Sequence, residues 1–311
     1  MKHTVVITDW GFPSLDAEHA ILEPHDVAIR AHQCKTEQEV AAAVAEADVV
    51  MAQWAPVKRT AIAAMKRCRG IVRYGIGLDN VDLDAAAERS IPVRNVPDYC
   101  LDEVADHTMA LLLAVQRQVR AVDSLVRGGT WKITPPLPLP PLRASVLGLV
   151  GFGRIARLVA TRAQSFGVRV VAFDPLVPKE VFARAGVEQS TLEDLFRTCD
   201  LISLHCPLTE TTRHLVNDTT IATMKEHAII VNTSRGGLVH TDALVTALNG
   251  RRIAGAGLDV FEQEPLPDTH PLRACDNVIL TSHNAWYSSA SVGELQKRAA
   301  LAALGLLQEH A

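Results

Sequence analysis

The sequence predicts an α/β protein of two domains built on parallel sheets, and three observations lead to this. Short apolar runs of strand length alternate with helical patterns along almost the whole chain, which is the signature of strand–helix–strand units. At 311 residues the chain is long enough for two domains of ordinary size. Its 48% hydrophobic and 21% charged residues are typical of a globular protein, and its 18 glycines and 16 prolines exclude collagen-like and disordered classes.

The first hundred residues are expected to form five short strands. These strands are residues 4–8, 27–29, 49–51, 71–73 and 93–95. Alanine-rich helical stretches such as residues 37–47 lie between them, and their small side chains suit close packing on a sheet.

One long helix is expected next, over residues 102–127, because apolar side chains recur there at helical spacing and two glycines follow. A helix of this length can join two domains. The proline-rich stretch at residues 134–141 then allows two interpretations. It could be a polyproline ligand for a recognition module, or a stiff connector between domains, which requires no partner.

The remainder of the chain is expected to form a second sheet with its own helices. The strands are residues 146–150, 168–173, 201–204, 229–232, 254–259 and 278–280. Helices are expected at residues 154–166 and 192–197, the second capped by Thr191. An alanine- and leucine-rich helix at residues 291–309 completes the chain.

Composition and short motifs exclude several classes of function. A formal charge of −4 gives no overall attraction to nucleic acid. The six cysteines include no Cys-x-x-Cys pair, so they are interpreted as reduced thiols and no metal site is expected. There is no signal-peptide pattern and no apolar stretch near the roughly 18 residues needed to span a bilayer. The sequence therefore predicts a cytoplasmic protein with neither nucleic-acid nor membrane partners.

One glycine motif has the context of a nucleotide site. Gly-x-Gly occurs three times, but only the copy that begins at Gly151 stands between an expected strand and an expected helix. Gly151 suits a tight turn, Gly153 leaves the backbone bare for a pyrophosphate, and Ala156 is small where helix meets strand. The free N–H groups of the helix that begins here would face the phosphates.

An aspartate follows at the end of the next expected strand. The carboxylate of Asp174 can accept hydrogen bonds from both hydroxyls of an adenosine ribose. A 2′-phosphate would place its negative charge against Asp174, and the next residues, Pro175 and Leu176, supply no cation. We therefore predict a Rossmann-type domain that binds NAD(H), with an ordinary glycine-containing turn and a surface aspartate as the alternative.

Three further segments follow later strands, at the edge where doubly wound sheets bind their ligands. Each segment offers one reactive side chain: Arg235 in residues 231–239, Glu264 in residues 257–265 and His283 in residues 280–288. Taken singly, none of the three requires a functional explanation, because most arginines are solvated and twelve histidines cannot all be catalytic.

Taken together, these segments resemble the D-isomer-specific 2-hydroxyacid dehydrogenase family, and the resemblance extends over nearly the whole chain. Residues 73–81 and 95–97 match as well, so five motifs occur in the family's order. The resemblance implies that a Rossmann-type NAD-binding domain, residues 100–283, is inserted into a smaller flavodoxin-like substrate domain. Residues 1–99 and 284–311 would form the substrate domain, with catalysis in the cleft between the domains, and the enzyme would be a homodimer.

The resemblance also implies roles for individual residues. Arg235 would bind the carboxylate of a 2-oxo acid and polarise its ketone. His283, as imidazolium, would protonate the ketone oxygen as hydride arrives from NADH, while Glu264 holds the ring and favours its charged form. The implied substrate-binding residues are Tyr74, Ile76, Gly77, Arg235 and Trp286. The implied cofactor-binding residues are Thr108, Gly151, Gly153, Arg154, Ile155, Asp174, Cys206, Thr233, Ser234 and Asp259, the last through the nicotinamide carboxamide.

Within the family, residues 283–288 and the Gly-Phe-Gly-Arg turn look most like the branch that includes the C-terminal-binding-protein corepressors. That branch places a tryptophan beside the substrate, which Trp286 matches; a buried core tryptophan is the alternative. Two positions depart from the commonest family pattern. Ser282 stands where proline usually precedes the histidine, and His240 stands where an acid usually follows Gly-Gly-Leu-Val.

The predicted function is hydride transfer between NADH and a 2-oxo acid. Trp286, with Trp54 and Tyr74, would give the pocket apolar walls, and Arg73 is the only other cation of the substrate loop. Unphosphorylated substrates are therefore expected. The alternative is an NAD(H)-gated binding protein of the corepressor type, and NADH oxidation against a panel of 2-oxo acids separates the two.

Overall fold

The computed structural model describes residues 3–134 and 140–309, and its contacts divide the chain into two compact units. Unit 1 comprises residues 1–100 and 287–311, and unit 2 comprises residues 101–286. Each unit contains its own parallel sheet, so the predicted α/β class is confirmed. Residues 284–286 were expected to begin the return to the substrate domain but belong to unit 2, where Asn284 and Ala285 donate to a buried aspartate.

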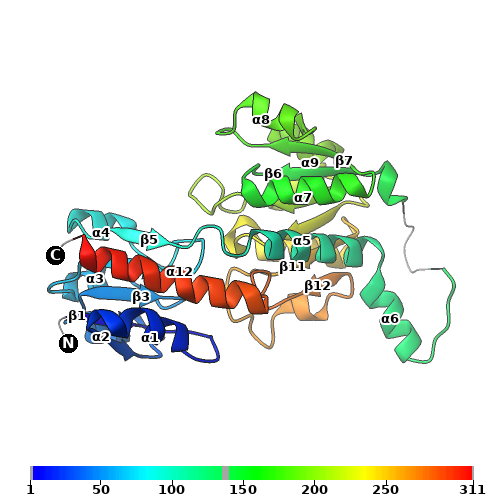
Figure 1. Cartoon of the computed structure of the whole chain (residues 1–311). Helices are drawn as coiled ribbons and strands as arrows, with labels where there is room; N and C mark the ends of the chain where they lie inside the picture. The colour runs from blue at the N-terminus through cyan, green and yellow to red at the C-terminus, as the bar shows by residue number, and fades with distance from the viewer. Residues whose placement is uncertain (1–2, 135–139, 310–311) are drawn as a thin grey trace. The chain divides into compact units, whose positions relative to one another are not determined.

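Unit 1 contains a five-stranded sheet in the order β2-β1-β3-β4-β5, which is the order of flavodoxin-like sheets. All neighbouring strands in it run parallel (Figure 1). Its elements are β1 (His3–Ile7), α1 (Asp16–Leu22), η1 (Glu23–His25), β2 (Val27–Ala31), α2 (Glu37–Val44), β3 (Val49–Ala52), α3 (Arg59–Ala64), β4 (Gly70–Arg73), α4 (Leu83–Glu88), β5 (Val93–Asn95) and α12 (Ser289–Gln308).

The final helix, α12, belongs to unit 1 because its apolar face packs against α1, β3 and β4. A Cβ atom on Gly70 of β4 would lie only 2.5 Å from the Leu306 side chain, so glycine is what allows helix and strand to approach. The helix begins with a capping box, in which the Ser288 hydroxyl accepts from the Ser291 amide and the Ser291 hydroxyl from the Ser288 amide.

Unit 2 contains a seven-stranded parallel sheet in the order β12-β11-β10-β9-β6-β7-β8. Its elements are α5 (Leu101–Gln116), α6 (Val119–Arg127), η2 (Leu142–Ala144), β6 (Val146–Val150), α7 (Arg154–Ser165), β7 (Arg169–Phe173), α8 (Lys179–Arg184), β8 (Glu188–Gln189), α9 (Leu192–Thr198), β9 (Leu201–Leu204), α10 (Asp218–Thr223), β10 (Ile229–Asn232), η3 (Gly236–Leu238), α11 (Thr241–Asn249), β11 (Gly255–Leu258), η4 (Pro271–Ala274) and β12 (Val278–Leu280).

Helices cover both faces of this sheet, and each face has its own apolar core. One core joins the sheet to α5 and α7, which lie side by side over one face in Figure 1. The other joins the sheet to α9, α10 and α11. The chain order reverses between β6 and β9, since β7 and β8 lie on one side of β6 and the later strands lie on the other. Doubly wound sheets bind their ligands at such a reversal.

The single long helix predicted over residues 102–127 is wrong, because the structure contains two helices there. α5 ends at Gln116, and Gln118 adopts a left-handed backbone conformation (φ 52°) before α6 begins. Apolar spacing alone could not show this break, because tertiary contacts hold the new direction. Arg120 donates to the carbonyl oxygens of Cys275 and Val278 at 3.3 and 2.7 Å, and α6 itself contains no buried residue.

Two further features of unit 2 bear on the sequence prediction: the proline-rich stretch and the strand β8. Residues 135–139, the centre of the proline-rich stretch, lie outside the described residues, so the choice between ligand and connector stays open. The two-residue strand β8 was not predicted; Glu188 and Gln189 are exposed and form no apolar run. Within the described part of the chain, no helix combines the length and the apolar character required to cross a bilayer.

Candidate active site

The predicted catalytic residues all follow neighbouring strands of unit 2, at the carboxyl edge of its sheet. Arg235 follows β10, Glu264 follows β11 and His283 follows β12, and these three strands are adjacent. The predicted cofactor residues Gly151 and Asp174 follow β6 and β7 on the other side of the reversal. Because parallel strands present their carboxyl ends at one edge, the sheet order places the predicted catalytic residues on one half of this edge and the predicted cofactor residues on the other.

Gly151 makes the tight turn that the glycine motif requires. Its φ is +91°, a conformation that favours glycine, and its amide donates to the Phe173 carbonyl at 2.8 Å. A Cβ atom here would lie 2.7 Å from the carbonyl carbon of His205, so a side chain would collide with the segment that follows β9. Gly151 thus brings the ends of β6, β7 and β9 together.

Gly153 has the opposite environment, because a Cβ atom there would have no neighbour within 4 Å. Gly153 is the N-cap of α7 and supplies no side-chain cap, so the first amides of this twelve-residue helix lack that partner. Arg154 occupies the first helical position, where a positive charge opposes the helix dipole unless an anion lies beside it. Open space, uncapped amides and a cation fit the pyrophosphate of a dinucleotide.

Asp174 lies at the end of β7 and is tied to the glycine turn. Its Oδ2 accepts from the Phe152 amide at 2.8 Å, and its Oδ1 accepts from the Leu176 amide at 2.9 Å. Each carboxylate oxygen has a second lone pair, so both can also accept a ribose hydroxyl. Phe152 anchors this turn from the other side, because its buried ring stacks on Phe182 with centroids 4.7 Å apart.

Four further predicted cofactor residues form a second layer around the ends of β9 and β10. Thr108 of α5 is fully buried, and its hydroxyl donates to the Val104 carbonyl at 2.7 Å and lies 2.8 Å from the Thr233 hydroxyl. Thr108 therefore supports Thr233 instead of presenting its own side chain at the surface. The Ser234 hydroxyl donates to the Cys206 carbonyl at 2.8 Å, and burial raises the pKa of the Cys206 thiol to about 11.

Glu264 and His283 form a close pair. Nδ1 of His283 lies 2.6 Å from Oε2 of Glu264, and each side chain is about one-third exposed. Burial opposes ionisation of Glu264, but the hydrogen bond and charge of His283, the Phe261 amide and the charge of Arg235 outweigh it. The pKa of the Glu264 carboxyl is consequently below its ordinary value of 4.5, so this carboxylate is ionised at neutral pH.

Glu264 is held by a close contact between the loops that follow β10 and β11. A Cβ atom on Gly236 would lie 1.9 Å from the carbonyl carbon of Phe261, so only glycine fits. The Phe261 amide in turn donates to Oε1 of Glu264 at 2.8 Å. Sequence reasoning did not assign a role to Gly236, although the pair Gly236–Gly237 directly after Arg235 was a visible signal.

Arg235 is oriented through its backbone by the fully buried Asn232, another residue that sequence reasoning did not single out. Nδ2 of Asn232 donates to the Arg235 carbonyl at 2.8 Å, and its Oδ1 accepts from the Ser234 amide at 3.0 Å. One guanidinium nitrogen of Arg235 donates to the Ser234 carbonyl at 2.6 Å. The arginine is thus fixed at its base beside the ionised Glu264.

Asp259 is in a different environment from the one expected for a nicotinamide contact. Its fully buried carboxylate accepts from the Thr281 hydroxyl at 2.6 Å and from the amides of Asn284 and Ala285 at 3.0 Å each. The loop that carries His283 thus wraps around Asp259. The nicotinamide contact stays a prediction, and the structure adds a role in holding this loop.

His283 itself adopts a left-handed backbone conformation, with φ +54°. Such a conformation costs a residue with a side chain roughly 1 kcal/mol or more, so the surroundings must impose it. Its amide donates to the Asp259 carbonyl at 2.8 Å, and its carbonyl accepts from Nε1 of Trp286 at 2.9 Å. Trp286 is half-buried, so it is neither the fully buried core residue of the alternative nor a freely exposed side chain.

The structure of unit 1 corrects the prediction that the Tyr74 side chain lines the substrate pocket. Only 1% of Tyr74 is exposed, its hydroxyl donates to Oε1 of the buried Glu18 at 2.9 Å, and its ring packs edge-on against Phe12. Burial and the neighbouring Glu18 charge raise the pKa of Tyr74 well above its ordinary value. Tyr74 is a core residue because α1 supplies a buried partner that local sequence could not reveal.

The loop at Ile76 and Gly77 directly follows Tyr74 and is half-buried. Nδ2 of Asn95 donates to the Ile76 carbonyl at 2.6 Å, so the family-like motif at residues 95–97 has a structural explanation. Trp54 is 48% exposed at the end of β3, where its ring lies over Gly11. The roles of Ile76, Gly77 and Trp54 toward a substrate stay predictions.

His240, which stands where the family pattern usually has an acid, caps the helix that follows it. Its Nδ1 accepts from the Ala243 amide at 3.3 Å at the start of α11. Its ring lies edge-to-face on that of His214, whose Nε2 is 2.6 Å from Oε1 of Glu262. Among the described residues, no group of three or more histidine, cysteine or acidic side chains is arranged to bind a metal ion.

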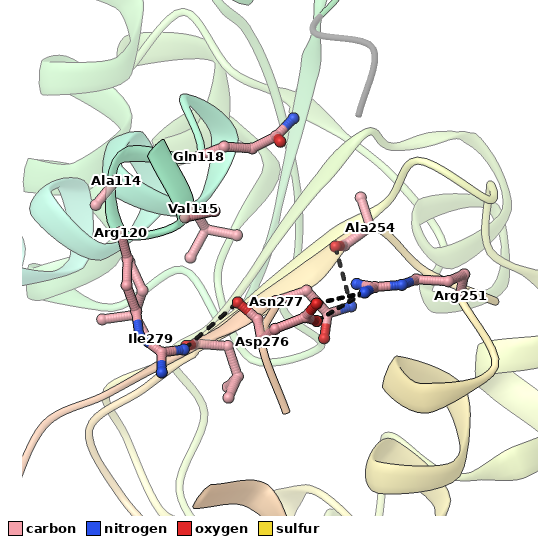
Figure 2. Close-up of a pocket in the computed structure, with 11 residues that line it drawn as sticks. Ala114, Val115, Gln118, Arg120, Arg251, Ala254, Asp276, Asn277 and Ile279 are labelled. Atoms are coloured by element: carbon pink, nitrogen blue, oxygen red, sulfur yellow. Dashed lines mark hydrogen bonds and ion pairs between the residues drawn. The ribbon is translucent and has the colours of Figure 1, made fainter. Parts of the chain in front are cut away.

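Unit 2 also contains a cavity of about 240 Å³ that includes no predicted site residue. It lies at the amino-terminal ends of β11 and β12, between them and the junction of α5 and α6 (Figure 2). Arg251 pairs with both oxygens of Asp276 on one side, and Val115 contributes to the apolar side. Because the catalytic residues follow the carboxyl ends of these strands, the cavity is separate from the candidate active site.

Comparison with known proteins agrees with this arrangement. Residues 109–285 match the model of the D-isomer specific 2-hydroxyacid dehydrogenase NAD-binding domain. A glyoxylate reductase of Korarchaeum cryptofilum is 42% identical over 233 residues, which cover 74% of this chain and 70% of that protein. A D-3-phosphoglycerate dehydrogenase of Methanocaldococcus jannaschii is 40% identical over 266 residues, which are 85% of this chain but only 50% of that protein.

A solved structure extends the likeness to almost the whole chain. D-lactate dehydrogenase from Aquifex aeolicus, crystallised with NAD and lactic acid, superposes with a TM-score of 0.89 at 26% identity. The superposition covers 98% of this chain and 96% of that one. The predicted family and cofactor are confirmed, while the corepressor-like branch stays a prediction. This chain belongs to the D-isomer specific 2-hydroxyacid dehydrogenase family of NAD-dependent oxidoreductases, and unit 2 contains its NAD-binding domain.

Proposed function

We propose that this enzyme reduces small or apolar, unphosphorylated 2-oxo acids with NADH and that Arg235, Glu264 and His283 perform the chemistry. The observation that carries the proposal is the pair of His283 and Glu264, 2.6 Å apart, beside the charge of Arg235. A histidine that must carry a proton benefits from an ionised carboxylate, and the depressed pKa of Glu264 supplies one.

The two ring nitrogens of His283 have different tasks in this proposal. Glu264 is an acceptor, so Nδ1 of His283 donates to it and Nε2 is left to face the substrate. In reduction, the imidazolium gives the Nε2 proton to the ketone oxygen; in oxidation, neutral Nε2 removes the proton of the hydroxyl. Arg235 binds the substrate carboxylate through its planar fork.

NADH, held by residues of unit 2, would supply the hydride that adds to the ketone carbon. Gly151, Gly153, Arg154 and Ile155 form the phosphate-binding turn, and Asp174 accepts from the adenosine ribose. Gly153→Ala tests this assignment because the added methyl meets open space in the protein itself. Tm should therefore not fall, while the KM for NADH rises. An unchanged KM for NADH would contradict the assignment of the pyrophosphate to this position.

The substrate class follows from the side chains around His283. Trp286 supplies an aromatic surface beside the histidine loop, and Arg235 is the cation predicted to anchor the substrate carboxylate. A phosphate ester usually needs several donors besides the one that binds the carboxylate. Glyoxylate, hydroxypyruvate, pyruvate and longer apolar 2-oxo acids are therefore the proposed substrates.

The decisive experiment is NADH oxidation with glyoxylate, hydroxypyruvate, pyruvate, longer apolar 2-oxo acids and a phosphorylated analogue. His283→Ala should nearly abolish reduction and leave NADH binding, followed by fluorescence, close to that of the wild type. If no 2-oxo acid is reduced although NADH binds, the corepressor-like binding function replaces this one. A preference for the phosphorylated substrate would contradict the proposed class.

We also propose that two copies of the chain associate, as the family resemblance implies. Val119 and Val126 of α6 are 54% and 47% exposed, and Trp131 and Ile133 beyond it are 83% and 92% exposed. Exposed apolar residues gathered in one short segment mark an interaction surface. Sedimentation equilibrium should give a dimer for the wild type and a monomer for Trp131→Glu; a wild-type monomer would exclude the dimer.

We also propose that the protein is cytoplasmic, and the state of its cysteine thiols supports this location. All six cysteines are free, and burial raises the pKa of Cys68 and of Cys199 to about 11. Such thiols are poorly reactive and suit a reducing compartment.

A further inference from the structure

We propose that His107 and Thr281 are positioning residues for the reaction, and that they act on His283 through Asp259. The inference rests on the proposed role of His283 as the proton donor. Nε2 of His107 lies 3.0 Å from the Thr281 hydroxyl oxygen, and that hydroxyl lies 2.6 Å from Oδ1 of Asp259. All four residues belong to unit 2.

The direction of each hydrogen bond follows from Asp259. Its carboxylate, 1% exposed, can only accept, so Thr281 must give its proton to Oδ1. The Thr281 oxygen can then only accept from His107, which fixes a proton on Nε2 of that ring. The chain therefore runs from the His107 N–H to the Thr281 oxygen, and from the Thr281 hydroxyl to Asp259.

Asp259, which these hydrogen bonds hold in place, in turn holds the loop that carries His283. Its two oxygens accept from the amides of Asn284 and Ala285, and its backbone carbonyl accepts from the amide of His283. These bonds surround the one residue of the loop that has a left-handed backbone, with φ +54°. If the Asp259 carboxylate moves, the loop can relax and the His283 ring turns away from Glu264.

His107 can perform this task in either protonation state. The neutral ring with its proton on Nε2 and the imidazolium both donate from Nε2, so either form makes the hydrogen bond to Thr281. Protonation would add a positive charge on a ring whose Nε2 is 3.7 Å from Oδ1 of Asp259, which favours the same arrangement. The requirement is thus a donor at this position, and a glutamine amide can supply one without titrating.

Four variants at the two positions separate donor chemistry from simple packing. Thr281→Val and His107→Leu remove the hydrogen bonds at nearly constant volume, whereas Thr281→Ser and His107→Gln keep them. With glyoxylate as substrate, the first two should lower kcat by roughly tenfold or more and leave the KM for NADH within about twofold. They should also move the alkaline limb of the kcat profile to lower pH, because His283 loses its alignment with Glu264.

The conservative variants should restore both kcat and the position of the limb. Because the two residues form one chain, Thr281→Val combined with His107→Leu should be no slower than Thr281→Val alone. His227→Leu is the matched control, since it removes a 2.8 Å contact between a histidine and the carboxylate of Asp200 at the opposite edge of the same sheet. His227→Leu should change neither kcat nor the pH of the alkaline limb of the kcat profile.

The inference is overturned if Thr281→Val and His107→Leu retain the wild-type kcat and pH profile, or if Thr281→Ser and His107→Gln do not show the wild-type kcat and pH profile. An equal loss in His227→Leu would also overturn it, because general destabilisation would then explain the effect. His283→Ala in the same assay distinguishes the two proposals. If it retains activity, the proposed function itself fails; if it alone is inactive, only the positioning role fails.

Discussion

Nδ1 of His283 and Oε2 of Glu264 are 2.6 Å apart, and the other Glu264 oxygen accepts from the Phe261 amide at 2.8 Å. One oxygen of the Glu264 carboxylate is therefore held by the backbone of its own loop, while the other orients the His283 ring. Since Nδ1 donates to Glu264, the His283 tautomer is set with Nε2 available. In the proposed mechanism, this contact selects Nε2 as the nitrogen that exchanges a proton with the substrate in either direction of the reaction.

Removal of the Glu264 charge should shift the pH dependence of reduction. Glu264→Gln can still accept a hydrogen bond from Nδ1 but no longer favours the imidazolium, so the alkaline limb of the kcat/KM profile should move to lower pH. At acid pH, where the ring is protonated in both proteins, their rates should converge. An unmoved limb would show that Glu264 has another role.

The cofactor preference should follow from Asp174. NADPH would lose two charge-assisted hydrogen bonds, at roughly 1.5–3 kcal/mol each, and would bring its phosphate against the carboxylate. The ratio of kcat/KM for NADH to that for NADPH should therefore exceed about tenfold. Asp174→Ala should reduce this ratio mainly by weakening NADH. Equal kcat/KM with both cofactors in the wild type would contradict the assignment.

Gly236→Ala should impair catalysis without any change in a reactive group. Its methyl would lie 1.9 Å from the Phe261 carbonyl carbon, so the loop that carries Glu264 must shift. Displacement of a catalytic group by about 1 Å can lower the rate roughly a hundredfold. Gly293→Ala in α12 meets no atom within 4 Å and should leave kcat unchanged, with a stability equal to or above that of the wild type.

Trp286→Ala should separate long substrates from short ones. The variant also loses the Nε1 bond to the His283 carbonyl, and this loss affects every substrate alike. The ratio of kcat/KM for a long apolar 2-oxo acid to that for glyoxylate isolates side-chain contact, at roughly 0.8 kcal/mol per buried methylene. If this ratio is unchanged, Trp286 supports the His283 loop and does not select the substrate.

His205 should make stability depend on pH in the acid range. Burial lowers the pKa of His205 from 6.5 to about 4, and its Nε2 lies 2.8 Å from the Ser203 hydroxyl oxygen. The unfolded chain takes up a proton near pH 6.5, which the folded chain takes up only near pH 4. The free energy of unfolding is therefore lost as pH falls through this window.

The variant His205→Gln removes this titration and keeps an amide near Nε2. Between pH 6.5 and 5, urea unfolding should show that the wild type loses more stability than His205→Gln, by an amount on the order of 1 kcal/mol. If both proteins lose the same amount, the His205 ring is solvated enough to titrate normally.

The sequence by itself determined the class of fold, and it predicted which side chains stand at the carboxyl edge of the second sheet. Alternating strand and helix patterns are local, so they predicted two parallel sheets, and the glycine turn with Asp174 predicted the nucleotide half. Arg235, Glu264 and His283 could be proposed because each follows an expected strand and because the three segments together resemble one family. Parallel strands carry such residues to one edge whatever their separation along the chain.

Tertiary structure decided which side chains reach that edge and how they are held. Tyr74 lies in a motif expected to bind substrate, yet its side chain is in the core, where its hydroxyl donates to Glu18 of α1. The helix over residues 102–127 breaks because Arg120 bonds to carbonyls more than 150 positions away. Thr281 and His107 meet around Asp259 only after α5, β11 and β12 have packed. Burial and hydrogen bonding of this kind depend on partners remote in sequence, which no local pattern encodes.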